Sequence, residues 1–382
     1  MSNLIILLFV LSAVSIVLLR TARPDILKRV INRLLELGAR RERIGPTTIR
    51  VVPHDTPYDI WLAKAKTEIP VFEGLAIGDV RSVDLQPWPA MGEGVKGLYL
   101  RFADYQITDG RIVEIQPHKE TRPQRHMFEM GIYSFGGPGH TIVQQEEEPP
   151  QRIDWNHRSL FSIPLNACYQ HFSDSEEPIR LLSVTSFPFV LNATNNEKFV
   201  FENPFLFTNR YNAEDDYLRR RHNVRKNLTR TNFVPDAVAY ELDKQDDRGK
   251  GASHMGWVMS GNTMLNLHVS EMPAKMHKKA HRHSSDAFVL ILSGEGYSVT
   301  WPDGAYYKRV RVDWHEGTLF VPPIYWYHKH LNPGSEPARY LAINAPILVQ
   351  NLGLRFTDQL EVDLPEIEEE WAREIMKRAY GK

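Results

Sequence analysis

The stretch Lys278-Lys279-Ala280-His281-Arg282-His283 decides how the rest of this 382-residue chain is interpreted. Its two histidines are separated by one residue, and side chains at that spacing project from the same face of a β-strand. Both imidazoles can therefore reach one point inside a barrel. His328 follows later, after Gly317 and the pair Pro322-Pro323. The sequence thus predicts a metal site formed by three imidazoles, those of His281, His283 and His328.

An internal repeat extends this pattern over most of the chain. Both copies consist of short runs with alternating polarity, interrupted by Gly, Pro, Asn and Asp, which indicates β-strands. The register is ungapped, so we expect two copies of one β-domain. The matched residues are Asp154-Trp155 with Asp313-Trp314, Leu160-Phe161 with Leu319-Phe320, Pro164 with Pro323, His171 with His330, and Glu177-Pro178 and Arg180 with Glu336-Pro337 and Arg339.

The two copies differ at the candidate metal site. Two of the three histidines have no counterpart in the first copy, so we expect that copy to be degenerate and free of a transition metal. Glu129, His126 and His171 are left there as candidates for a polar pocket. The aligned pairs are Tyr169 with His328, Gln124 with His281 and, after a small shift of register, His126 with His283.

These motifs resemble those of the cupin superfamily, in which Gly, His-x-His, Glu and Gly are followed by a second motif of Gly, Pro, Gly, His and Asn. Tyr325 replaces the middle glycine of the second motif, and Ala287 stands where the family has a glutamate ligand. The resemblance implies an all-β fold of two cupin (jelly-roll) barrels in tandem, a bicupin. The matching residues are His281, His283 and Gly294, then Gly317, Pro323, His328 and Asn332.

The missing glutamate makes the second copy similar to gentisate 1,2-dioxygenase and its relatives. That resemblance implies Fe(II) on three neutral imidazoles, with Mn, Ni or Zn as alternatives. Three facial nitrogens leave room for a bidentate substrate and dioxygen. Because no carboxylate neutralises the cation, we expect an anionic or phenolic small-molecule substrate, and oxidative cleavage of an aromatic or other oxygen-bearing molecule.

Strand alternation predicts which neighbours face the metal. If His328 points inward, Trp326 and His330 also do, whereas Tyr327 and Lys329 point away. His330 is the candidate for acid–base catalysis or for a hydrogen bond to the substrate, and Trp326 is the candidate for a stacking wall. The alternatives are a structural hydrogen bond for His330 and core packing for Trp326.

The same alternation applies to the strand that follows His283. It places Ser285, Ala287 and Val289 on the inward face and turns Arg282 outward. Tyr325 and Lys279 are weaker candidates near the mouth of the barrel.

The N-terminal residues 1–22 are predicted to form a single-pass membrane anchor. Leu4 to Leu19 is almost wholly apolar, and basic residues from Arg20 onward place the body in the cytoplasm. Residues 23–45 are predicted to form a juxtamembrane amphipathic helix, with apolar positions at helical spacing up to Gly38. The alternatives are a buried core segment for 1–22 and a helix packed on the barrel for 23–45.

The remaining boundaries follow from composition. We expect the N-terminal cupin at 46–203, a polar connector with one short helix at 204–255, the C-terminal cupin at 256–350 and a helical tail at 351–382 that begins near Pro365. The formal net charge of −1 argues against a nucleic-acid partner. The one cysteine, Cys168, excludes an internal disulfide and is expected to be a small buried hydrophobic residue.

Two other functions stay open at this point. One is a non-oxidative metal-dependent cupin enzyme, such as a decarboxylase, lyase or isomerase. The other is a non-catalytic ligand-binding or accessory cupin at the membrane, since one barrel type serves many roles. A homo-oligomer is also left open.

Overall fold

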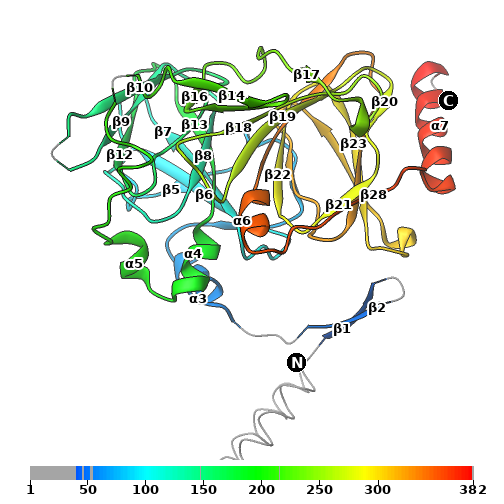
Figure 1. Ribbon diagram of the computed structural model, residues 1–382, viewed down its shortest axis with the longest axis horizontal. Helices are drawn as coiled ribbons and strands as arrows, with labels where there is room; N and C mark the ends of the chain where they lie inside the picture. Colours follow the sequence, from blue (N-terminus) through cyan, green and yellow to red (C-terminus); the bar gives the residue numbers. More distant parts are fainter. Residues whose placement is uncertain (1–39, 45–46, 52–54, 147, 215, 381–382) are drawn as a thin grey trace, which may run out of the picture. The chain divides into compact units, whose positions relative to one another are not determined.

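A computed structural model describes residues 40–44, 47–51, 55–146, 148–214 and 216–380 (Figure 1). The chain divides into two units. The smaller comprises Met1–Asp55 and Asp303–Ala305, and the larger comprises Thr56–Pro302 and Tyr306–Lys382. In the smaller unit β1 (Arg40–Ile44) and β2 (Thr47–Val51) form an antiparallel hairpin.

The predicted N-terminal segments fall only partly within the described residues. The anchor at 1–22 and residues 23–39 of the predicted amphipathic helix lie outside the described residues. Arg40–Ile44, the last part of the segment predicted at 23–45, lie beyond the expected helix end at Gly38 and form a strand in which each residue pairs with one residue of β2. No helix in the described ranges is both long and apolar enough to cross a bilayer.

The first barrel consists of two sheets. One has the order β10-β9-β12, and the other β16-β11-β8-β13-β7-β6-β3, with β5 also on β6. Its strands are β3 (Val71–Gly74), β5 (Gln86–Pro87), β6 (Val95–Phe102), β7 (Asp109–Ile115), β8 (Met130–Ser134), β9 (Gly139–Gln144), β10 (Gln151–Trp155), β11 (Leu160–Ser162), β12 (Cys168–Ser173) and β13 (Ile179–Thr185).

The second barrel repeats this plan. Its sheets have the orders β14-β15-β18-β19-β27-β22-β25-β4, with β17 on β18, and β24-β23-β26-β21-β28, with β20 on β26. Its strands are β14 (Arg221–Arg225), β15 (Leu228–Thr231), β17 (Asp243–Lys244), β18 (Ser253–Val258), β19 (Asn266–Met272), β20 (Met276–His277), β21 (His281–His283), β22 (Ala287–Ser293), β23 (Glu295–Trp301), β24 (Val310–His315), β25 (Leu319–Phe320), β26 (Tyr327–Asn332), β27 (Ala338–Asn344) and β28 (Thr357–Gln359).

Each barrel includes one strand from a part of the chain that the predicted domain boundaries assign to a different segment. Strand β16 (Phe233–Val234) lies in the predicted connector and pairs with β11 of the first barrel. Strand β4 (Ala76–Ile77) lies in the N-terminal copy and pairs with β25 of the second barrel. The two barrels also share an apolar core, in which the rings of Phe102 and Phe288 lie 5.3 Å apart. They therefore depend on each other for stability.

The connector at 204–255 is more regular than predicted. It contains β14 to β17 besides the short 3₁₀ helix η1 (Asp246–Arg248), and β18 begins at Ser253, before the predicted start of the second cupin. Strand β14 is exposed along its whole length. A polar composition therefore marks an exposed edge strand here and not a coil.

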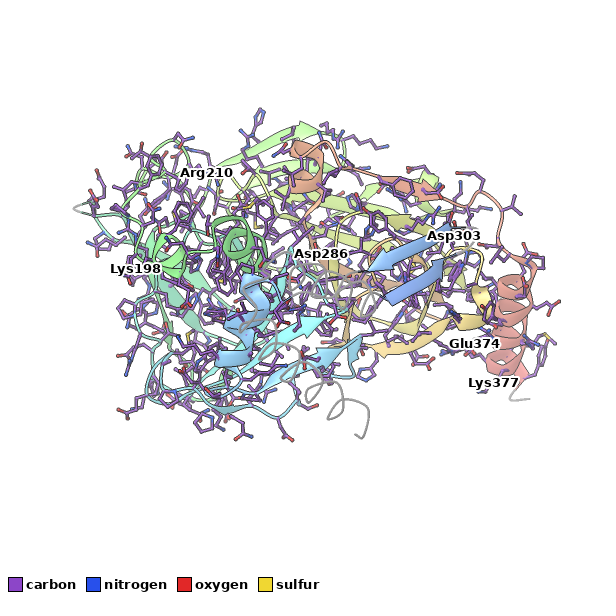
Figure 2. All side chains as sticks on the ribbon, turned by 90° about the horizontal axis from the view of Figure 1, so that it is seen from below. Lys198, Arg210, Asp286, Asp303, Glu374 and Lys377 are labelled. Atoms are coloured by element: carbon purple, nitrogen blue, oxygen red, sulfur yellow. The ribbon has the colours of Figure 1, made fainter. Side chains whose placement is uncertain are left out.

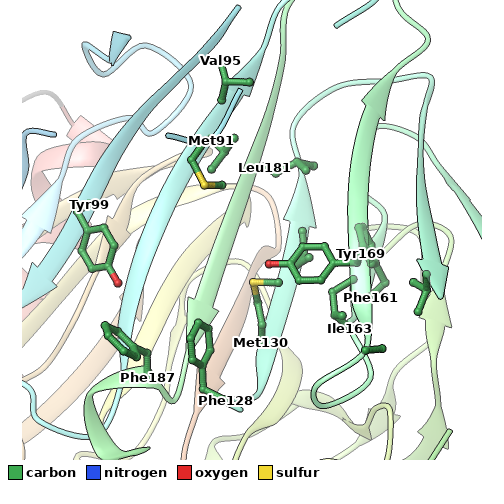
Figure 3. Packing of buried hydrophobic residues seen from close by; sticks show 14 of the residues in the cluster. Met91, Val95, Tyr99, Phe128, Met130, Phe161, Ile163, Tyr169, Leu181 and Phe187 are labelled. Atoms are coloured by element: carbon green, nitrogen blue, oxygen red, sulfur yellow. The ribbon is translucent and has the colours of Figure 1, made fainter. Parts of the chain in front are cut away.

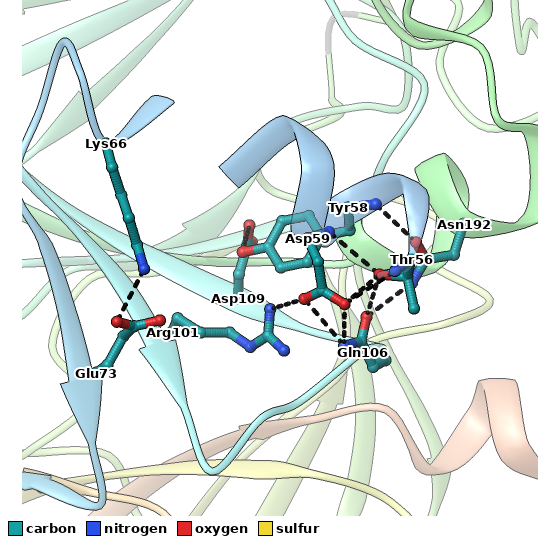
Figure 4. A network of polar contacts seen from close by, with 9 residues as sticks. All are labelled: Thr56, Tyr58, Asp59, Lys66, Glu73, Arg101, Gln106, Asp109 and Asn192. Atoms are coloured by element: carbon teal, nitrogen blue, oxygen red, sulfur yellow. Dashed lines mark hydrogen bonds and ion pairs between the residues drawn. The ribbon is translucent and has the colours of Figure 1, made fainter. Parts of the chain in front are cut away.

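In the part of the chain that the structure describes, five α-helices accompany the strands of the two barrels. They are α3 (Pro57–Ala65), α4 (Phe187–Thr194), α5 (Glu197–Phe201), α6 (Pro346–Asn351) and α7 (Pro365–Tyr380), with a further 3₁₀ turn η2 (Tyr306–Lys308). Thr56 and Asp59 form a capping box at the start of α3, and the Tyr58 hydroxyl donates to Asp109 at 3.0 Å (Figure 4). This network fixes α3 to the first barrel.

The predicted terminal helix is confirmed as α7. Ile367 is buried and Trp371 packs beside it against the second barrel, while Glu374 on the same helix (labelled in Figure 2) lies 3.3 Å from Arg311 of β24. The preceding tail adds a feature that was not predicted, because β28 pairs with β21, the strand that carries His281 and His283.

The repeated arginines have a structural role. Arg180 donates to Glu114 at 2.8 Å and to the carbonyls of Val80 and Val83. Arg339 makes the equivalent contacts in the second barrel, with Glu271 and the carbonyls of Val238 and Tyr240. The arginine matched in the sequence repeat therefore holds, in each barrel, the segment of chain that precedes the first long strands.

Candidate metal centre

Two neighbouring strands bring the three predicted histidines together. His281 of β21 lies directly opposite His328 of β26 in the antiparallel register, and His283 follows two residues along. The ring centroids of His281 and His328 are 4.3 Å apart, and those of His283 and His328 are 4.9 Å apart. One nitrogen from each ring lies within 4.8 Å of the others. The predicted cluster is therefore present.

Main-chain carbonyls orient all three rings. The Nδ1 of His281 lies 3.1 Å from the carbonyl of Lys279, that of His283 lies 2.6 Å from the carbonyl of Ser285, and that of His328 lies 3.3 Å from the carbonyl of Trp326. A carbonyl only accepts, so each Nδ1 carries the hydrogen and each Nε2 keeps its lone pair. This is the arrangement that metal-binding histidines normally show.

The electrostatics of the cluster keep the imidazoles neutral. Burial is the largest cause that lowers the pKa of His283, to about 4. Burial, and then the neighbouring histidines, hold the pKa of His281 and of His328 well below the ordinary value. Neutral imidazole is the form that binds a metal ion. Three lone pairs aimed at one point also repel one another unless a cation is there, so these residues fit a transition metal.

The position of the family's glutamate is confirmed as apolar. Ala287 lines the cavity beside the histidines. The adjacent acid, Asp286, is buried and turned away, and it accepts a hydrogen bond from the Thr108 N–H at 2.8 Å. Burial raises the pKa of Asp286 to about 6. No carboxylate is therefore available to the cluster from this strand.

The histidines open into a cavity of about 640 Å³ between the two sheets of the second barrel. Within the described residues its lining holds no Asp or Glu. It holds six histidines and five cationic side chains, namely His254, His268, His281, His283, His328, His330, Arg225, Lys226, Arg248, Lys278 and Arg355. A cavity with this charge favours an anionic ligand.

The inward and outward positions predicted for these strands are found in the structure, with the exception of Trp326. Ser285 and Val289 line the cavity together with Ala287. On the opposite face Arg282 lies over the ring of Tyr327 at 4.6 Å, and Lys329 forms an ion pair with Asp363 at 2.7 Å. The outward residues thus attach the C-terminal tail to the barrel.

His330 lies next to the cluster, and its ring centroid is 5.6 Å from that of His328. Its Nδ1 lies 2.8 Å from the Ser298 hydroxyl, which accepts from the indole N–H of Trp314 at 3.0 Å. The first barrel has the same arrangement in Trp155, Thr141 and His171. The structural hydrogen bond considered for His330 is therefore present, and Nε2 is the nitrogen left to face the cavity.

Trp326 is not among the residues that line the cavity. It precedes β26, and its N–H donates to the carbonyl of Pro323 at 3.1 Å. Strand alternation does not hold in this turn, because Tyr325 adopts a left-handed conformation with φ of 65°. What Trp326 supplies is the carbonyl that faces His328. The stacking wall predicted for its side chain does not form at this cavity.

The two weaker candidates also lie away from the histidines. Tyr325 is half exposed at the turn, and its N–H donates to the carbonyl of His283. The Lys279 ammonium pairs with Glu361, and the Lys279 carbonyl orients His281. Both residues support the ligands through their main chains.

A guanidinium stands at the centre of the first barrel. Arg111 of β7 donates to the Tyr169 hydroxyl at 2.9 Å, and that hydroxyl also lies 3.0 Å from the Nε2 of His126 and from Gln124 (Tyr169 is labelled in Figure 3). Burial and then Arg111 lower the pKa of both His126 and His171 to about 3. A fixed cation therefore stands among the residues that align with the histidine cluster.

Two expectations for the first copy are wrong. Glu129 does not join His126, because its carboxylate accepts from the main-chain N–H groups of Thr263, Met264 and Leu265. It acts as a clamp between the copies, as Asp286 does through Thr108. Cys168 is exposed, because it is the first residue of strand β12 and its side chain lies on the outward face of that strand.

Sequence reasoning missed the wall that faces the metal cluster. His254 of β18 and His268 of β19 have ring centroids 4.8 Å apart and line the same cavity, with Lys278 and Tyr340. His268 lies on the strand equivalent to β7, which carries Arg111. Arg111 and His268 occupy equivalent inward positions in the two copies. A polar residue at this position in both copies was the sequence signal that could have revealed the wall.

The repeated sheet order, the reciprocal strand pairings and the shared polar contacts all describe two copies of one jelly-roll plan. The fold is bicupin-like.

No family model and no curated protein matches the chain. Among solved structures, the chain is similar to oxalate decarboxylase of Lactobacillus farciminis, with 13% identity over 71% of this chain and 86% of that one and a TM-score of 0.48. It is also similar to salicylate 1,2-dioxygenase of Pseudaminobacter salicylatoxidans, with 13% identity over 66% and 75% and a TM-score of 0.47.

A third similar structure is vicilin of Corylus avellana, with 10% identity over 81% of this chain and 97% of that one and a TM-score of 0.47. These proteins differ in what their names describe, and similarity at this level carries no argument about activity. The function of this bicupin-like chain has to be argued from its own site.

Proposed function

We propose that the protein is an Fe(II)-dependent dioxygenase that cleaves a small aromatic or other oxygen-bearing organic anion in its second barrel. The observation that carries the proposal is the convergence of three neutral imidazoles with no acid among the described residues of the cavity. The motif resemblance to three-histidine dioxygenases points to the same chemistry.

The three Nε2 atoms of His281, His283 and His328 would hold the metal. Fe(II) bound there would supply open positions for substrate oxygens and for dioxygen. Mn, Ni or Zn fit the same nitrogens, and affinity alone does not select among them.

The chain's own residues would bind and orient the substrate. The cationic lining attracts an anion into the cavity. It has little effect on the entry of a neutral molecule. Ser298 accepts from Trp314, and in the tautomer that we propose its hydroxyl donates to Nδ1 of His330, so that the hydrogen of His330 is on Nε2. His330 would then donate a hydrogen bond to a substrate oxygen, and it is our candidate for moving a proton.

An oxygen-uptake assay tests this function. The protein would be purified without air, loaded separately with Fe(II), Mn(II) or Zn(II), and given gentisate, salicylate, catechol and a β-diketone. We expect oxygen uptake with Fe(II) and at least one of these compounds, and none in a His281→Ala/His328→Ala variant that keeps its circular-dichroism spectrum.

Other outcomes assign the alternative functions. Release of CO₂ or an isomerised product without oxygen uptake would indicate the non-oxidative enzyme. Ligand binding without turnover by any metal form, unchanged in the double variant, would indicate a binding or accessory protein.

Attachment to a membrane is a separate part of the proposal. It rests on the apolar run from Leu4 to Leu19 and the basic residues that follow it. Replacing Val10 and Val14 by Lys in the full chain should release it from membranes washed with alkaline carbonate. If carbonate releases the wild-type chain as readily as the variant, the proposed membrane attachment is wrong, and the proposed enzymatic function is unaffected.

A further inference from the structure

Two buried lysines of the second barrel differ in their partners. Lys329 is 1% exposed, and its ammonium lies 2.7 and 2.8 Å from the carboxylate oxygens of Asp363. Lys278 is 4% exposed, and its ammonium donates to the Tyr340 hydroxyl at 3.0 Å. Within the described residues Lys278 forms no ion pair. One buried cation is thus neutralised, and the other is not.

A buried cation that lacks an anion is unfavourable, because it loses its hydration without gaining a counter-charge. The ammonium also has three hydrogens, of which one is directed at Tyr340. Lys278 lines the cavity of the histidine cluster, so an anion in that cavity would supply the missing charge and accept the remaining hydrogens.

The surroundings of Lys278 form a hydrogen-bonding wall. Its ammonium lies 4.9 Å from the centre of the Tyr340 ring on β27. His254 and His268 line the same cavity as Lys278, and burial, with Lys278 among the further causes, lowers the pKa of both. The Nδ1 of His254 lies 3.0 Å from the Ser270 hydroxyl. His254, His268, Ser270 and Tyr340 belong to the sheet that faces β21 and β26, whereas Lys278 precedes β21 and its N–H donates to the carbonyl of His330 on β26.

The wall and the histidine cluster are close enough for one small molecule to contact both. The ring centroid of His330 lies 6.3 Å from that of His281 and 5.1 Å from that of Tyr340. His330 is therefore close both to the Tyr340 ring, whose hydroxyl accepts from Lys278, and to the predicted ligands His281 and His328.

We propose that Lys278, positioned by Tyr340, is a binding residue for a carboxylate of the ligand, with His254 and His268 completing that end of the cavity. The ligand is then an organic carboxylate whose other oxygen-bearing end faces His281, His283 and His328. This deepens the proposed function and rests on it for calling the carboxylate a substrate. The carboxylate site itself requires no metal.

Paired probes test the site. Salicylate and its uncharged amide, salicylamide, would be titrated by calorimetry into the metal-free protein and into the Zn(II)-loaded protein. A charge-assisted hydrogen bond in a buried site predicts a preference for salicylate of about tenfold or more in both forms. Lys278→Gln should abolish this preference, and Lys278→Arg should restore part of it.

A matched control separates the anchor from the general charge of the cavity. Lys226 lines the same cavity but is exposed, so Lys226→Gln should change the preference by less than about threefold. If Lys278→Gln does not fold, Tyr340→Phe keeps the lysine and removes its hydroxyl partner, and it should weaken salicylate binding. Circular dichroism and thermal unfolding of each variant accompany the titrations.

The outcomes distinguish this site from the metal. The His281→Ala/His328→Ala variant should lose the visible absorption of bound Co(II) and keep its preference for salicylate. A wild-type preference without any metal binding would leave the carboxylate site standing and end the dioxygenase proposal. An unchanged preference in Lys278→Gln, or equal binding of salicylate and salicylamide by the wild type, would overturn the site. Displacement of salicylate by equimolar inorganic phosphate would overturn the carboxylate assignment.

Discussion

The guanidinium of Arg111 and the hydroxyl of Tyr169 are 2.9 Å apart at the centre of the first barrel, where Tyr169 takes the place of His328. Arg111 is partly buried, and its fixed charge repels a second cation placed beside it. The loss of two histidines is thus accompanied by a built-in positive charge. This gives a physical reason for one metal ion per chain.

Removing the hydroxyl should therefore affect stability and not metal content. Tyr169→Phe leaves buried polar groups of Arg111, His126 and Gln124 without their partner, which should lower the free energy of unfolding by about 1–3 kcal/mol. Urea denaturation measures this, with the exposed Tyr307→Phe as the control. A second equivalent of bound metal in Tyr169→Phe would contradict the role given to Arg111.

Removing the same hydrogen bond from each barrel separates structure from catalysis. Ser298→Ala frees His330, and Thr141→Ala frees His171 in the equivalent arrangement. Both should lower the free energy of unfolding by about 1 kcal/mol. Only Ser298→Ala should lower kcat, because only His330 faces the metal cluster. Equal kcat values for the two variants would show that orientation of His330 is unimportant.

The buried histidines of the first barrel predict how stability depends on pH. The pKa of His126 is about 3, below its ordinary value, so the unfolded chain binds more protons between these limits. Stability is therefore full above about pH 6.5 and is lost as the pH falls toward 3. Each such histidine contributes a slope of about 1.4 kcal/mol per pH unit in that window.

His126→Gln should remove the contribution of one histidine, and so reduce the slope of the unfolding free energy against pH by about 1.4 kcal/mol per pH unit. Unfolding free energies from urea denaturation at pH 7, 6, 5 and 4 would measure it. Asp109 acts in the opposite direction, because burial raises its pKa to about 6 and its contribution is lost as the pH rises from about 3.8 to 6. An identical slope in wild type and His126→Gln would mean that His126 is not buried in its neutral form.

The ion pair of Lys329 and Asp363 should be needed to attach the C-terminal tail. Lys329→Met leaves the Asp363 carboxylate largely buried and unpaired, at a cost of about 3–5 kcal/mol. The double variant Lys329→Met/Asp363→Leu should recover most of that loss. Limited proteolysis before α7, with mass analysis of the fragments, measures release of the tail. Equal effects of the single and double variants would contradict the pairing.

The metal cluster was predictable because its signal is local. His281 and His283 have the period of a strand, and the repeat showed that His328 belongs to an equivalent strand. Ser285, Ala287 and Val289 followed from the same alternation. The prediction for Trp326 is wrong because alternation was extended through the turn at Tyr325, where the backbone is left-handed.

Long-range partners could not be predicted. Glu129 is satisfied by N–H groups more than 130 residues away in the sequence, so nothing near it shows its role. The exchange of β4 and β16 between barrels likewise depends on tertiary pairing of two-residue strands. Lys278 stands next to the histidine motif, yet only the structure distinguishes it from Lys329, which is neutralised.

A crystal structure of the metal-loaded protein, with the ion located by anomalous scattering, tests the central claim most directly. We predict one anomalous peak per chain, about 2.0–2.2 Å from the Nε2 atoms of His281, His283 and His328 and with no carboxylate ligand from this chain. A peak in the first barrel, a carboxylate in the coordination sphere, or an equal metal content in the His281→Ala/His328→Ala variant would contradict the account.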